Sequence, residues 1–365
     1  MQSQRIALVV DSMYGGGAEK VVLTLRRALE SLGHDAHAIA LEAAGHYDTS
    51  PEQHLHFLRG PARYPGGARA YGRQAEELRE LIGSVEKRDG RRFTLVVANL
   101  INAQQVVARA GLWNSYYCVH ASIDAALKQT LRRNPLQYLR QRRQNHVLDG
   151  KRVITVSRGL ERELCESPWL KPASVQTIYN PFDLDAIRSL ARAPGEPLPS
   201  GRYLLHVGRA SHQKRLDVLM AALREVPEIP LVMLTNHPDK VMGIATRFGV
   251  AERVRAVAFR QNPYPWMAHA TLVVLSSDYE GFPLVAVEAL ACGTPVVSTD
   301  CPHGPSEILT GPLARGLAPM GDPPALAARM RDLLARPPDV AGADILNQVE
   351  ASAIAARYAA LGAAP

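Results

Sequence analysis

The sequence predicts an α/β protein with two doubly wound, parallel-sheet domains that face a cleft. Its 365 residues are 47% hydrophobic by type, and at about 100–200 residues per domain this length suits two domains with large cores. Short β-branched runs alternate with longer stretches of helical periodicity, which indicates parallel strands joined by crossover helices. The same layout begins again near residue 200, so we expect one Rossmann-like domain in each half.

In the first half, the run RIALVV predicts a strand at Arg5–Val10. Apolar residues at helical spacing predict a helix over Ala18–Leu32, which Gly33 ends. Further strands are expected at Ala36–Leu41, Thr94–Ala98, Tyr116–Val119 and Val153–Val156. The stretch Asp48–Gly72 is rich in Pro, Gly and His, and we expect it to be a loop region.

The second half repeats this pattern. A strand is expected at Tyr203–Val207, a turn over Gly208–Lys214 and a helix over Leu216–Val226. More strands are expected at Leu231–Thr235, Val254–Phe259, Leu272–Leu275 and Pro295–Thr299. Because ligands of doubly wound sheets bind beyond the carboxyl ends of the strands, we expect the functional site in the cleft between the two domains.

The boundary between the domains is expected where the composition changes. Between the two halves lie Pro194, Gly195, Pro197, Pro199 and Gly201, a composition typical of a linker. We therefore expect an N-terminal domain at residues 1–184, a linker at 185–201 and a C-terminal domain at 202–345. A last helix is expected at residues 346–365, in a position to pack back on the N-terminal domain.

The charge is uneven along the chain. The net charge is +7; residues 1–180 carry 25 Lys or Arg against 17 Asp or Glu, and residues 181–365 carry 17 against 18. The segment Leu127–Arg143 mixes six cations with apolar residues. Such a segment suits an anionic membrane surface, and a plain solvated surface is the alternative. Nucleic acid would fit the charge, but no nucleic-acid-binding motif accompanies it, so we expect no nucleic-acid partner.

The sequence also bears on location. The apolar run Ile6–Val10, among the longest, falls far short of the ~20 residues of a membrane span, and residues 1–5 do not form a secretory signal pattern. We therefore expect a cytoplasmic protein. A peripheral contact with the inner face of the cell membrane is compatible with this location. The four cysteines, Cys118, Cys165, Cys292 and Cys301, lack C-x-x-C spacing, which favours reduced thiols over a metal site.

Two glutamates stand out in the segment DYEGFPLVAVEALACG at residues 278–293. Pro283 and Gly293 fit the two ends of a short helix with almost no polar face, which should therefore be buried. Glu288 lies in the middle of this helix, and Glu280 lies at its mouth. A buried carboxylate must be paired, either by a neighbouring Arg or N–H group or by two hydroxyls such as a ribose diol.

Three further groups favour anion or sugar binding, each weakly by itself. The sequence GRASHQKR at Gly208–Arg215 places cations at a strand-to-helix turn, where the helix dipole is also positive. The turn Gly15–Gly17 offers backbone N–H groups to an anion, although it is not G-x-G-x-x-G. His120 ends an expected strand and can be either a structural or a functional residue.

Together these residues resemble glycosyltransferase family 4. The resemblance rests on the Glu280-x7-Glu288 pair and the GR-x4-KR sequence at Gly208–Arg215. Further matches are GGGAEK at 15–20, His120, Ile178–Asp183 and Cys301–Glu307, so that the resemblance covers nearly the whole chain. It implies the GT-B fold and a retaining, nucleotide-sugar-dependent transferase of the kind that builds bacterial surface polysaccharide or lipopolysaccharide.

The resemblance assigns roles to single residues. Arg209 and Lys214 would neutralise the donor diphosphate, and Glu288 would bind the ribose hydroxyls. Glu280 would hold hydroxyls of the transferred sugar, and His120 would contact that sugar near the reacting carbon. The backbone of Gly15, Gly16 and Gly17 would approach the diphosphate, while Gly281, Phe282 and Leu284 would offer N–H groups to the sugar and phosphate. No metal or other cofactor is implied, because fixed cations take the metal's place.

Some alternatives stay open. The family often has Gly-x-Gly where this chain has Asn236-His237-Pro238, and Gly where it has Arg260; both turns neighbour the base pocket. The resemblance favours a UDP-hexose or UDP-N-acetylhexosamine donor and a glycan or lipid-linked acceptor, with GDP-mannose as the alternative donor. A non-catalytic nucleotide-sugar-binding relative is a further alternative. A nicotinamide-dependent oxidoreductase would need a glycine fingerprint that this sequence lacks.

Overall fold

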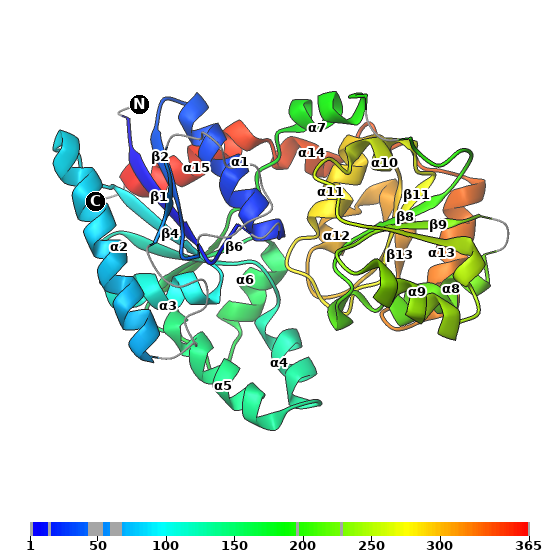
Figure 1. Ribbon diagram of the computed structural model, residues 1–365, viewed down its shortest axis with the longest axis horizontal. Helices are drawn as coiled ribbons and strands as arrows, with labels where there is room; N and C mark the ends of the chain where they lie inside the picture. The colour runs from blue at the N-terminus through cyan, green and yellow to red at the C-terminus, as the bar shows by residue number, and fades with distance from the viewer. Residues whose placement is uncertain are drawn as a thin grey trace. The chain divides into compact units, whose positions relative to one another are not determined.

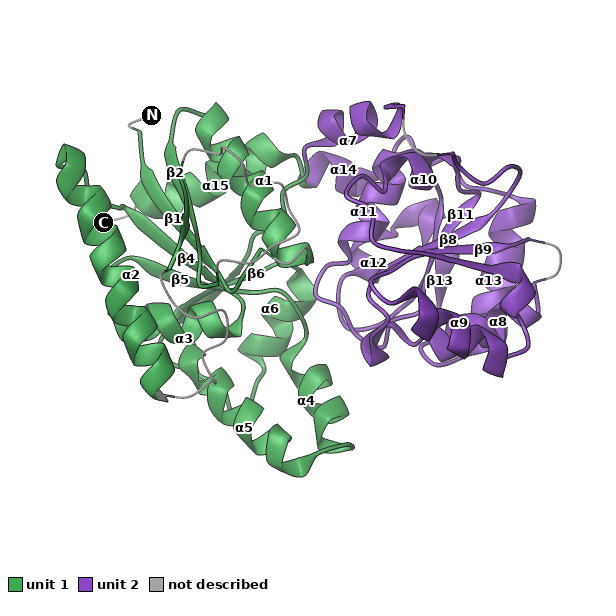
Figure 2. Cartoon of the chain, in the orientation of Figure 1, with its two compact units in different colours: residues 1–182, 349–365 green, residues 183–348 purple. Residues whose placement is uncertain are grey.

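The computed structural model describes residues 3–13, 16–42, 54–58, 68–194, 197–226 and 229–363. The chain divides into two compact units, which Figure 2 shows in green and purple. Unit 1 comprises residues 1–182 and 349–365, and unit 2 comprises residues 183–348. Each unit is built on one parallel sheet with helices packed against it (Figure 1), so the expected pair of α/β domains is confirmed.

Unit 1 contains a seven-stranded sheet in the order β3-β2-β1-β4-β5-β6-β7. Its strands are β1 (Arg5–Val10), β2 (Asp35–Ala40), β3 (Leu55–Phe57), β4 (Leu95–Asn99), β5 (Ser115–Val119), β6 (Arg152–Thr155) and β7 (Ser174–Thr177). All neighbouring pairs are parallel. All six residues of β1 are buried, as expected for a central strand with helices on both faces, and this explains its unbroken apolar run.

The helices of unit 1 follow the strands. They are α1 (Gly17–Ser31), α2 (Ala68–Asp89), α3 (Ile101–Ala110), α4 (Ile123–Leu131), α5 (Pro135–Asn145), α6 (Arg158–Cys165) and α15 (Ala351–Ala363), with a 3₁₀ turn η1 at His146–Leu148. The end of the chain returns to this unit, because Phe182 N–H donates to Val349 O and Ala351 N–H donates to Phe182 O. Helix α15 then packs against α1 and β4.

Unit 2 contains a six-stranded sheet in the order β10-β9-β8-β11-β12-β13. The strands are β8 (Leu204–Val207), β9 (Leu231–Leu234), β10 (Val254–Val257), β11 (Leu272–Leu275), β12 (Val296–Thr299) and β13 (Leu317–Ala318). Its helices are α7 (Leu184–Ala191), α8 (Leu216–Arg224), α9 (Pro238–Arg247), α10 (Tyr264–His269), α11 (Leu284–Ala291), α12 (Pro305–Ile308), α13 (Pro323–Ala335) and α14 (Asp344–Gln348), with 3₁₀ turns η2 (His212–Lys214), η3 (Ala251–Arg253) and η4 (Gly311–Gly316). A core lies between this sheet and helices α8 and α13.

Some elements differ from the expectation. The expected linker at 185–201 begins in helix α7, which forms because the Asp183 side chain caps the Ala186 N–H group and Leu184 and Ile187 are buried at helical spacing. The expected end of the C-terminal domain, at residue 345, falls inside helix α14, and the last helix starts at Ala351 rather than at 346.

The expected loop at Asp48–Gly72 falls largely outside the described residues. Its described parts contain strand β3 and the start of α2, whose apolar residues Tyr71, Leu78, Ile82 and Val85 are buried on one face. The Pro, Gly and His content of that stretch hid both elements from the sequence analysis. Among the described residues, no helix combines the length and apolar character that crossing a membrane requires.

Candidate active site at the carboxyl ends of the strands

In unit 2, the loop after β8 and the loop after β11 are joined by three hydrogen bonds. The Ser276 hydroxyl donates to Lys214 O at 2.7 Å, and Asp278 N–H donates to Gln213 O at 2.9 Å. The Gln213 side-chain amide donates to Tyr279 O at 2.7 Å. Turn η2 is therefore held against the residues that precede Glu280.

This attachment brings two predicted site residues into contact. The Lys214 ammonium donates to Glu280 Oε1 at 2.6 Å, and the Ser277 hydroxyl donates to the same oxygen at 2.6 Å. The two charged side chains are only 15% and 11% exposed. A cation and a carboxylate thus lie side by side, largely shielded from water, at the carboxyl ends of two neighbouring strands.

The loop after β8 carries two further cations, Arg209 and Arg215, which differ in exposure and in ion pairing. Arg209 is exposed, directly after the strand and its glycine. Arg215, by contrast, makes ion pairs with Asp278 and Asp217, each at 2.8 Å. These ion pairs, together with its position at the start of α8, make Arg215 part of the scaffold. Arg209 and Lys214 are therefore the cations of this loop that suit an anionic ligand.

The position of Glu280 also depends on the loop that follows β12. Glu280 N–H donates to Pro302 O, and His303 N–H donates to Glu280 O, at 2.7 and 3.0 Å. Next in this loop is Gly304, at φ +102°, where an added Cβ would lie 2.8 Å from Pro283 Cδ and 2.9 Å from the Phe282 Cα. Only glycine fits both this φ and this close approach.

The expected short helix after Glu280 is confirmed as α11, and its middle residues are buried. Glu288 is 4% exposed, as the sequence analysis expected for a carboxylate on a helix without a polar face. Gly281 and Phe282 are buried just before this helix. Leu284 is the first helical residue, so its N–H group has no acceptor within the helix.

In unit 1, His120 follows the carboxyl end of β5 and contacts Asn99 at the end of β4, with 3.0 Å between Nε2 and Oδ1. The Asn99 amide nitrogen faces the carbonyls of Val9 and Val97, so Oδ1 is the acceptor and His120 Nε2 carries the proton. His120 Nδ1 is then a hydrogen-bond acceptor. Burial lowers the pKa of His120 to about 4, which keeps the imidazole neutral.

The glycine turn of unit 1 is described in part. Gly15 lies outside the described residues, Gly16 precedes α1 and Gly17 is its first residue. A Cβ on Gly16 would collide with the carboxylate of Glu19, which is buried in the first turn of α1. A side chain at position 16 would therefore displace the Glu19 carboxylate.

Two polar residues near these loops were not found by the sequence analysis. Asp11 follows β1 and accepts hydrogen bonds from Ala103 N–H at 2.7 Å and from the Asn102 amide at 2.9 Å. Burial raises the pKa of Asp11 to about 7, outweighing these hydrogen bonds. A polar residue directly after an apolar strand, at the edge where ligands of such sheets bind, is the signal that could have identified it.

The second residue is His206, which is fully buried within β8. Its Nδ1 donates to Val274 O at 2.9 Å, while Nε2 has no hydrogen-bond partner among the described residues. A Cβ built on Gly208 would lie 3.2 Å from this Nε2 and 3.5 Å from Lys214 Cε, so the imidazole lies beneath the turn that carries Lys214. Its polar character within the apolar run YLLHV was the available signal.

Comparison with known families decides the identity of the chain. Residues 15–186 match the family model described as Glycosyltransferase Family 4, and residues 201–336 match the one described as Glycosyl transferases group 1. The chain is a family 4 glycosyltransferase. The two matched regions contain the Lys214–Glu280 pair and His120, so the enzyme's sequence-predicted site residues lie within the regions shared with the family.

Among its relatives is a Campylobacter jejuni enzyme named N-acetylgalactosamine-N,N'-diacetylbacillosaminyl-diphospho-undecaprenol 4-alpha-N-acetylgalactosaminyltransferase. The two are 25% identical over 318 residues, which cover 84% of this chain and 83% of the relative. Two solved structures share the fold: sucrose-phosphate synthase from Thermosynechococcus elongatus, with a TM-score of 0.76, and HepE from Anabaena in complex with UDP-glucose, with 0.72. Each is 20% identical and covers 98% of both chains, so the enzyme has the GT-B fold.

The enzyme's departure from the family's turn after β9 has a visible structural consequence. In place of Gly-x-Gly, the Asn236 side chain accepts a hydrogen bond from Ala210 N–H at 3.2 Å, and the Lys240 ammonium donates to Ala210 O at 2.7 Å. The loop after β8 is thus supported on this side by side chains of the β9–α9 region. These contacts fasten the segment between Arg209 and Lys214.

Proposed function

We propose that the enzyme transfers a hexose or N-acetylhexosamine from a nucleotide diphosphate sugar, with a UDP sugar preferred, to a glycan or lipid-linked acceptor. The proposal rests chiefly on the contact between Lys214 and Glu280. It pairs a cation suited to a diphosphate with a carboxylate suited to sugar hydroxyls at the edge of the sheet. The Campylobacter relative, whose name describes N-acetylgalactosaminyl transfer to a diphospho-undecaprenol-linked acceptor, supports the acceptor class.

Donor binding is proposed to rearrange this pair. The diphosphate would take hydrogen bonds from Lys214 and from the exposed Arg209, which would free an oxygen of Glu280 for hydroxyls of the transferred sugar. The first N–H groups of α11, including that of Leu284, would also face the ligand. Glu288, buried on the same helix, would bind the ribose hydroxyls.

For the chemical step we propose transfer on one face of the sugar, with retention of configuration. The bond between the anomeric carbon and the leaving phosphate oxygen breaks, and a new bond forms between that carbon and the acceptor oxygen. The acceptor's hydroxyl proton passes to the leaving diphosphate. Negative charge grows on the diphosphate during this step, where Lys214 and Arg209 stabilise it, while His120 positions the sugar through its neutral imidazole.

The test is a donor panel with an undecaprenyl-diphosphate-linked sugar as acceptor. We expect nucleotide release to be fastest with UDP-hexoses or UDP-N-acetylhexosamines, and the anomeric configuration of the product, read by NMR coupling constants, to match that of the donor. Faster turnover of GDP-mannose would contradict the UDP preference. An inverted product would contradict retention.

We further propose that transfer needs no metal ion. The positive charge of Lys214 and Arg209 would perform the stabilisation that a divalent cation provides elsewhere. Activity is therefore expected to persist in excess chelator. Loss of activity in chelator, with rescue by magnesium or manganese, would overturn this part of the proposal.

We also propose that helices α4 and α5 contact an anionic membrane. No residue of α5 is buried, and Leu131, Leu136 and Leu139 are 46%, 80% and 58% exposed. Exposed cations surround them: Lys128, Arg132, Arg133, Arg140 and Arg143. The contact surface is smaller than the sequence indicated, because Leu127 is buried and Arg142 lies over the Trp169 ring.

Liposome flotation tests this contact. At about 1 kcal/mol per cation near an anionic surface, five cations give reversible binding that salt weakens. Reversing Arg132, Arg133, Arg140 and Arg143 to Glu should abolish flotation with anionic vesicles at low salt. Reversing four exposed arginines in or near α2, Arg69, Arg79, Arg88 and Arg92, changes the net charge equally and serves as the control. Equal loss of flotation in both variants would mean that binding depends on the net charge of the protein and not on the surface of α4 and α5.

A further inference from the structure

A cluster of histidines at one edge of the unit 1 sheet lies outside the proposed transfer site. Strand β2 carries Asp35 and His37, and the neighbouring segment carries His54 and His56 at its start and within β3. Side chains two residues apart on a strand lie on the same face. The parallel register pairs Ala38 with Leu55 and Ile39 with His56, and Ala38 N–H donates to His54 O. The four side chains therefore gather on one face of two adjacent strands.

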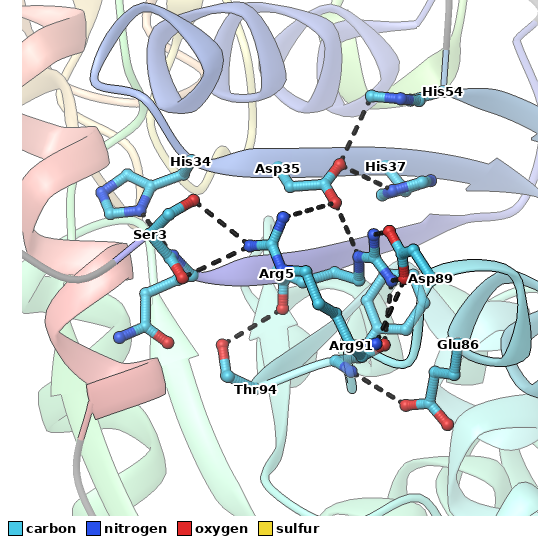
Figure 3. A network of polar contacts seen from close by, with 12 residues as sticks. Ser3, Arg5, His34, Asp35, His37, His54, Glu86, Asp89, Arg91 and Thr94 are labelled. Atoms are coloured by element: carbon cyan, nitrogen blue, oxygen red, sulfur yellow. Dashed lines mark hydrogen bonds and ion pairs between the residues drawn. The ribbon is translucent and has the colours of Figure 1, made fainter.

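Three of these residues offer converging ligand atoms. Asp35, His37 and His54 each place one such atom within 4.8 Å of the others. Asp35 Oδ1 lies 2.9 Å from His37 Nε2 and 3.5 Å from His54 Nδ1, and Figure 3 shows both imidazoles directed at this carboxylate. In a tetrahedral zinc site with bonds of about 2.0–2.1 Å, neighbouring ligand atoms are about 3.3 Å apart. The two distances in the structure lie on either side of that value.

The atom of His54 that faces the cluster is Nδ1. His54 Nδ1 is buried, and among the described residues it has no hydrogen-bond partner. The ring as a whole is 40% exposed, so the cluster can be reached from solvent. Glu30 Oε1 lies 3.7 Å from the same nitrogen and could supply a further oxygen ligand.

Neighbouring residues hold the Asp35 carboxylate in position. Asp35 Oδ2 accepts from Arg5 Nε at 2.6 Å, and Arg5 is also paired with Asp89, so its charge is balanced while Oδ1 remains directed at the histidines (Figure 3).

The second nitrogen of His37 is held as well. His37 Nδ1 lies 2.8 Å from His56 Nε2. With a metal on Nε2, His37 Nδ1–H would donate to His56. A partner on the second ring nitrogen is the arrangement that fixes the tautomer and the orientation of metal-ligating histidines.

We propose that Asp35, His37 and His54 form a binding site for a divalent transition-metal ion, with zinc as the best match to two imidazoles and a carboxylate, and a fourth position open to water or Glu30. The ion would tie the segment at His54, next to the three-residue edge strand β3, to strand β2. Because the site lies on the sheet edge and not among the proposed transfer residues, its role would be to stabilise unit 1. The proposal is independent of the metal-free transfer proposed above.

The experiment uses the full-length protein without a histidine tag, stripped with chelator and titrated with zinc in a calorimeter. We expect one ion per chain and a higher midpoint of thermal unfolding with zinc than with chelator. His54→Ala should lose at least tenfold in affinity together with the thermal shift. The control is His146→Ala, which removes an exposed histidine paired with Asp149 at 2.7 Å. It should bind like the wild type.

No stoichiometric binding by the wild type, or equal binding by wild type and His54→Ala, would overturn the proposal. Wild-type crystals soaked in zinc provide a measurement that does not depend on the variant. An anomalous peak within about 2.3 Å of Asp35, His37 and His54 supports the site, since zinc–ligand bonds are about 2.0–2.2 Å long. Peaks only elsewhere on the protein would mean that zinc binds adventitiously and would overturn the proposal.

Discussion

The polar edges of the two sheets differ in how they hold their functional groups. In unit 2, Lys214 and Glu280 are both charged and neutralise each other at 2.6 Å. In unit 1, desolvation lowers the pKa of the half-buried His120 to about 4, which keeps it neutral, and raises the pKa of the half-buried Asp11 to about 7. A pair of opposite charges can be divided between a diphosphate and a sugar, whereas neutral groups suit uncharged hydroxyls. We take this difference as support for the proposed role of the Lys214–Glu280 pair in binding the donor.

The largest expected effect is that of Lys214→Ala. Charge develops on the leaving diphosphate in the transition state, so loss of this cation should lower kcat by about 10²–10³-fold, as for other single electrostatic donors. Steady-state kinetics with a saturating donor measure it. Arg247→Ala removes an exposed cation at the end of α9 and should leave kcat unchanged.

Whether the Lys214→Ala substitution changes kcat or KM decides the role of Lys214. A Lys214→Ala enzyme with a normal kcat and a raised KM for the donor would show that Lys214 contributes ground-state binding alone. The charged pair in unit 2 would then only bind the donor, and the difference between the two sheet edges would not bear on catalysis.

Glu288→Gln should have the next largest effect, on donor binding. The amide is nearly isosteric, so no cavity forms, but charge-assisted hydrogen bonds worth about 1.5–3 kcal/mol are lost, which corresponds to roughly 10- to 150-fold in Kd. Calorimetry with the nucleotide sugar measures it, with Glu252→Gln, an exposed carboxylate of unit 2, as the control. Unchanged affinity in Glu288→Gln would mean that Glu288 only stabilises the fold.

The sequence predicted these two residues because their surroundings are local. Glu288 lies on a helix whose other residues are apolar, and Lys214 follows a strand by a few residues, so pattern marked both as candidates. The family resemblance then supplied the roles predicted for them. The sequence could not show that Lys214 contacts Glu280, since that contact depends on hydrogen bonds between loops more than 60 residues apart, such as that of Ser276 to Lys214. Nor could it separate Lys214 from Arg215, which only the ion pairs with Asp217 and Asp278 assign to the scaffold.

The elements of the fold also differed in how well the sequence predicted them. The central strand β1 is buried along its whole length and carries an unbroken apolar run, so it was identified with its correct bounds. The edge strands β3, β7 and β13 have two to four residues each and were missed, because a short, partly exposed strand has little hydrophobic pattern. Helix α7 was taken for linker because its eight residues precede a Pro- and Gly-rich stretch.

A smaller effect is expected for His120→Ala, on the neutral side of the comparison. If His120 positions the sugar through one neutral hydrogen bond, worth about 0.5–1.5 kcal/mol, kcat should fall by roughly 2- to 12-fold. The exposed residue His146 provides the control variant, His146→Ala. A decrease as large as that of Lys214→Ala would instead give His120 a role in the chemical step and remove the proposed difference between the two edges.

The last prediction concerns the pH dependence of stability and not catalysis. The pKa values of His37, His120 and His206 are each lowered by burial from 6.5 to about 4. Between these two values these three histidines bind protons in the unfolded chain but not in the folded chain, so they make stability fall as the pH falls from about 6.5 to 4. The pKa values of His34 and His56 are also lowered by burial, and these groups act in the same direction. Asp11 acts in the opposite direction, because burial raises its pKa from 3.8 to about 7 and the folded state then binds the extra proton.

The histidines outnumber Asp11 and leave a net loss of stability on acidification, which urea unfolding at several pH values between 4 and 7 can measure. Asp11→Asn removes the opposing group and should make stability fall more steeply as the pH decreases, whereas His120→Asn removes one of the histidines and should make the fall shallower. Stability that is flat across this range in all three proteins would show that the buried groups titrate normally. In that case, burial would not be what keeps the polar edge of unit 1 neutral, and its contrast with the charged pair of unit 2 would need another cause.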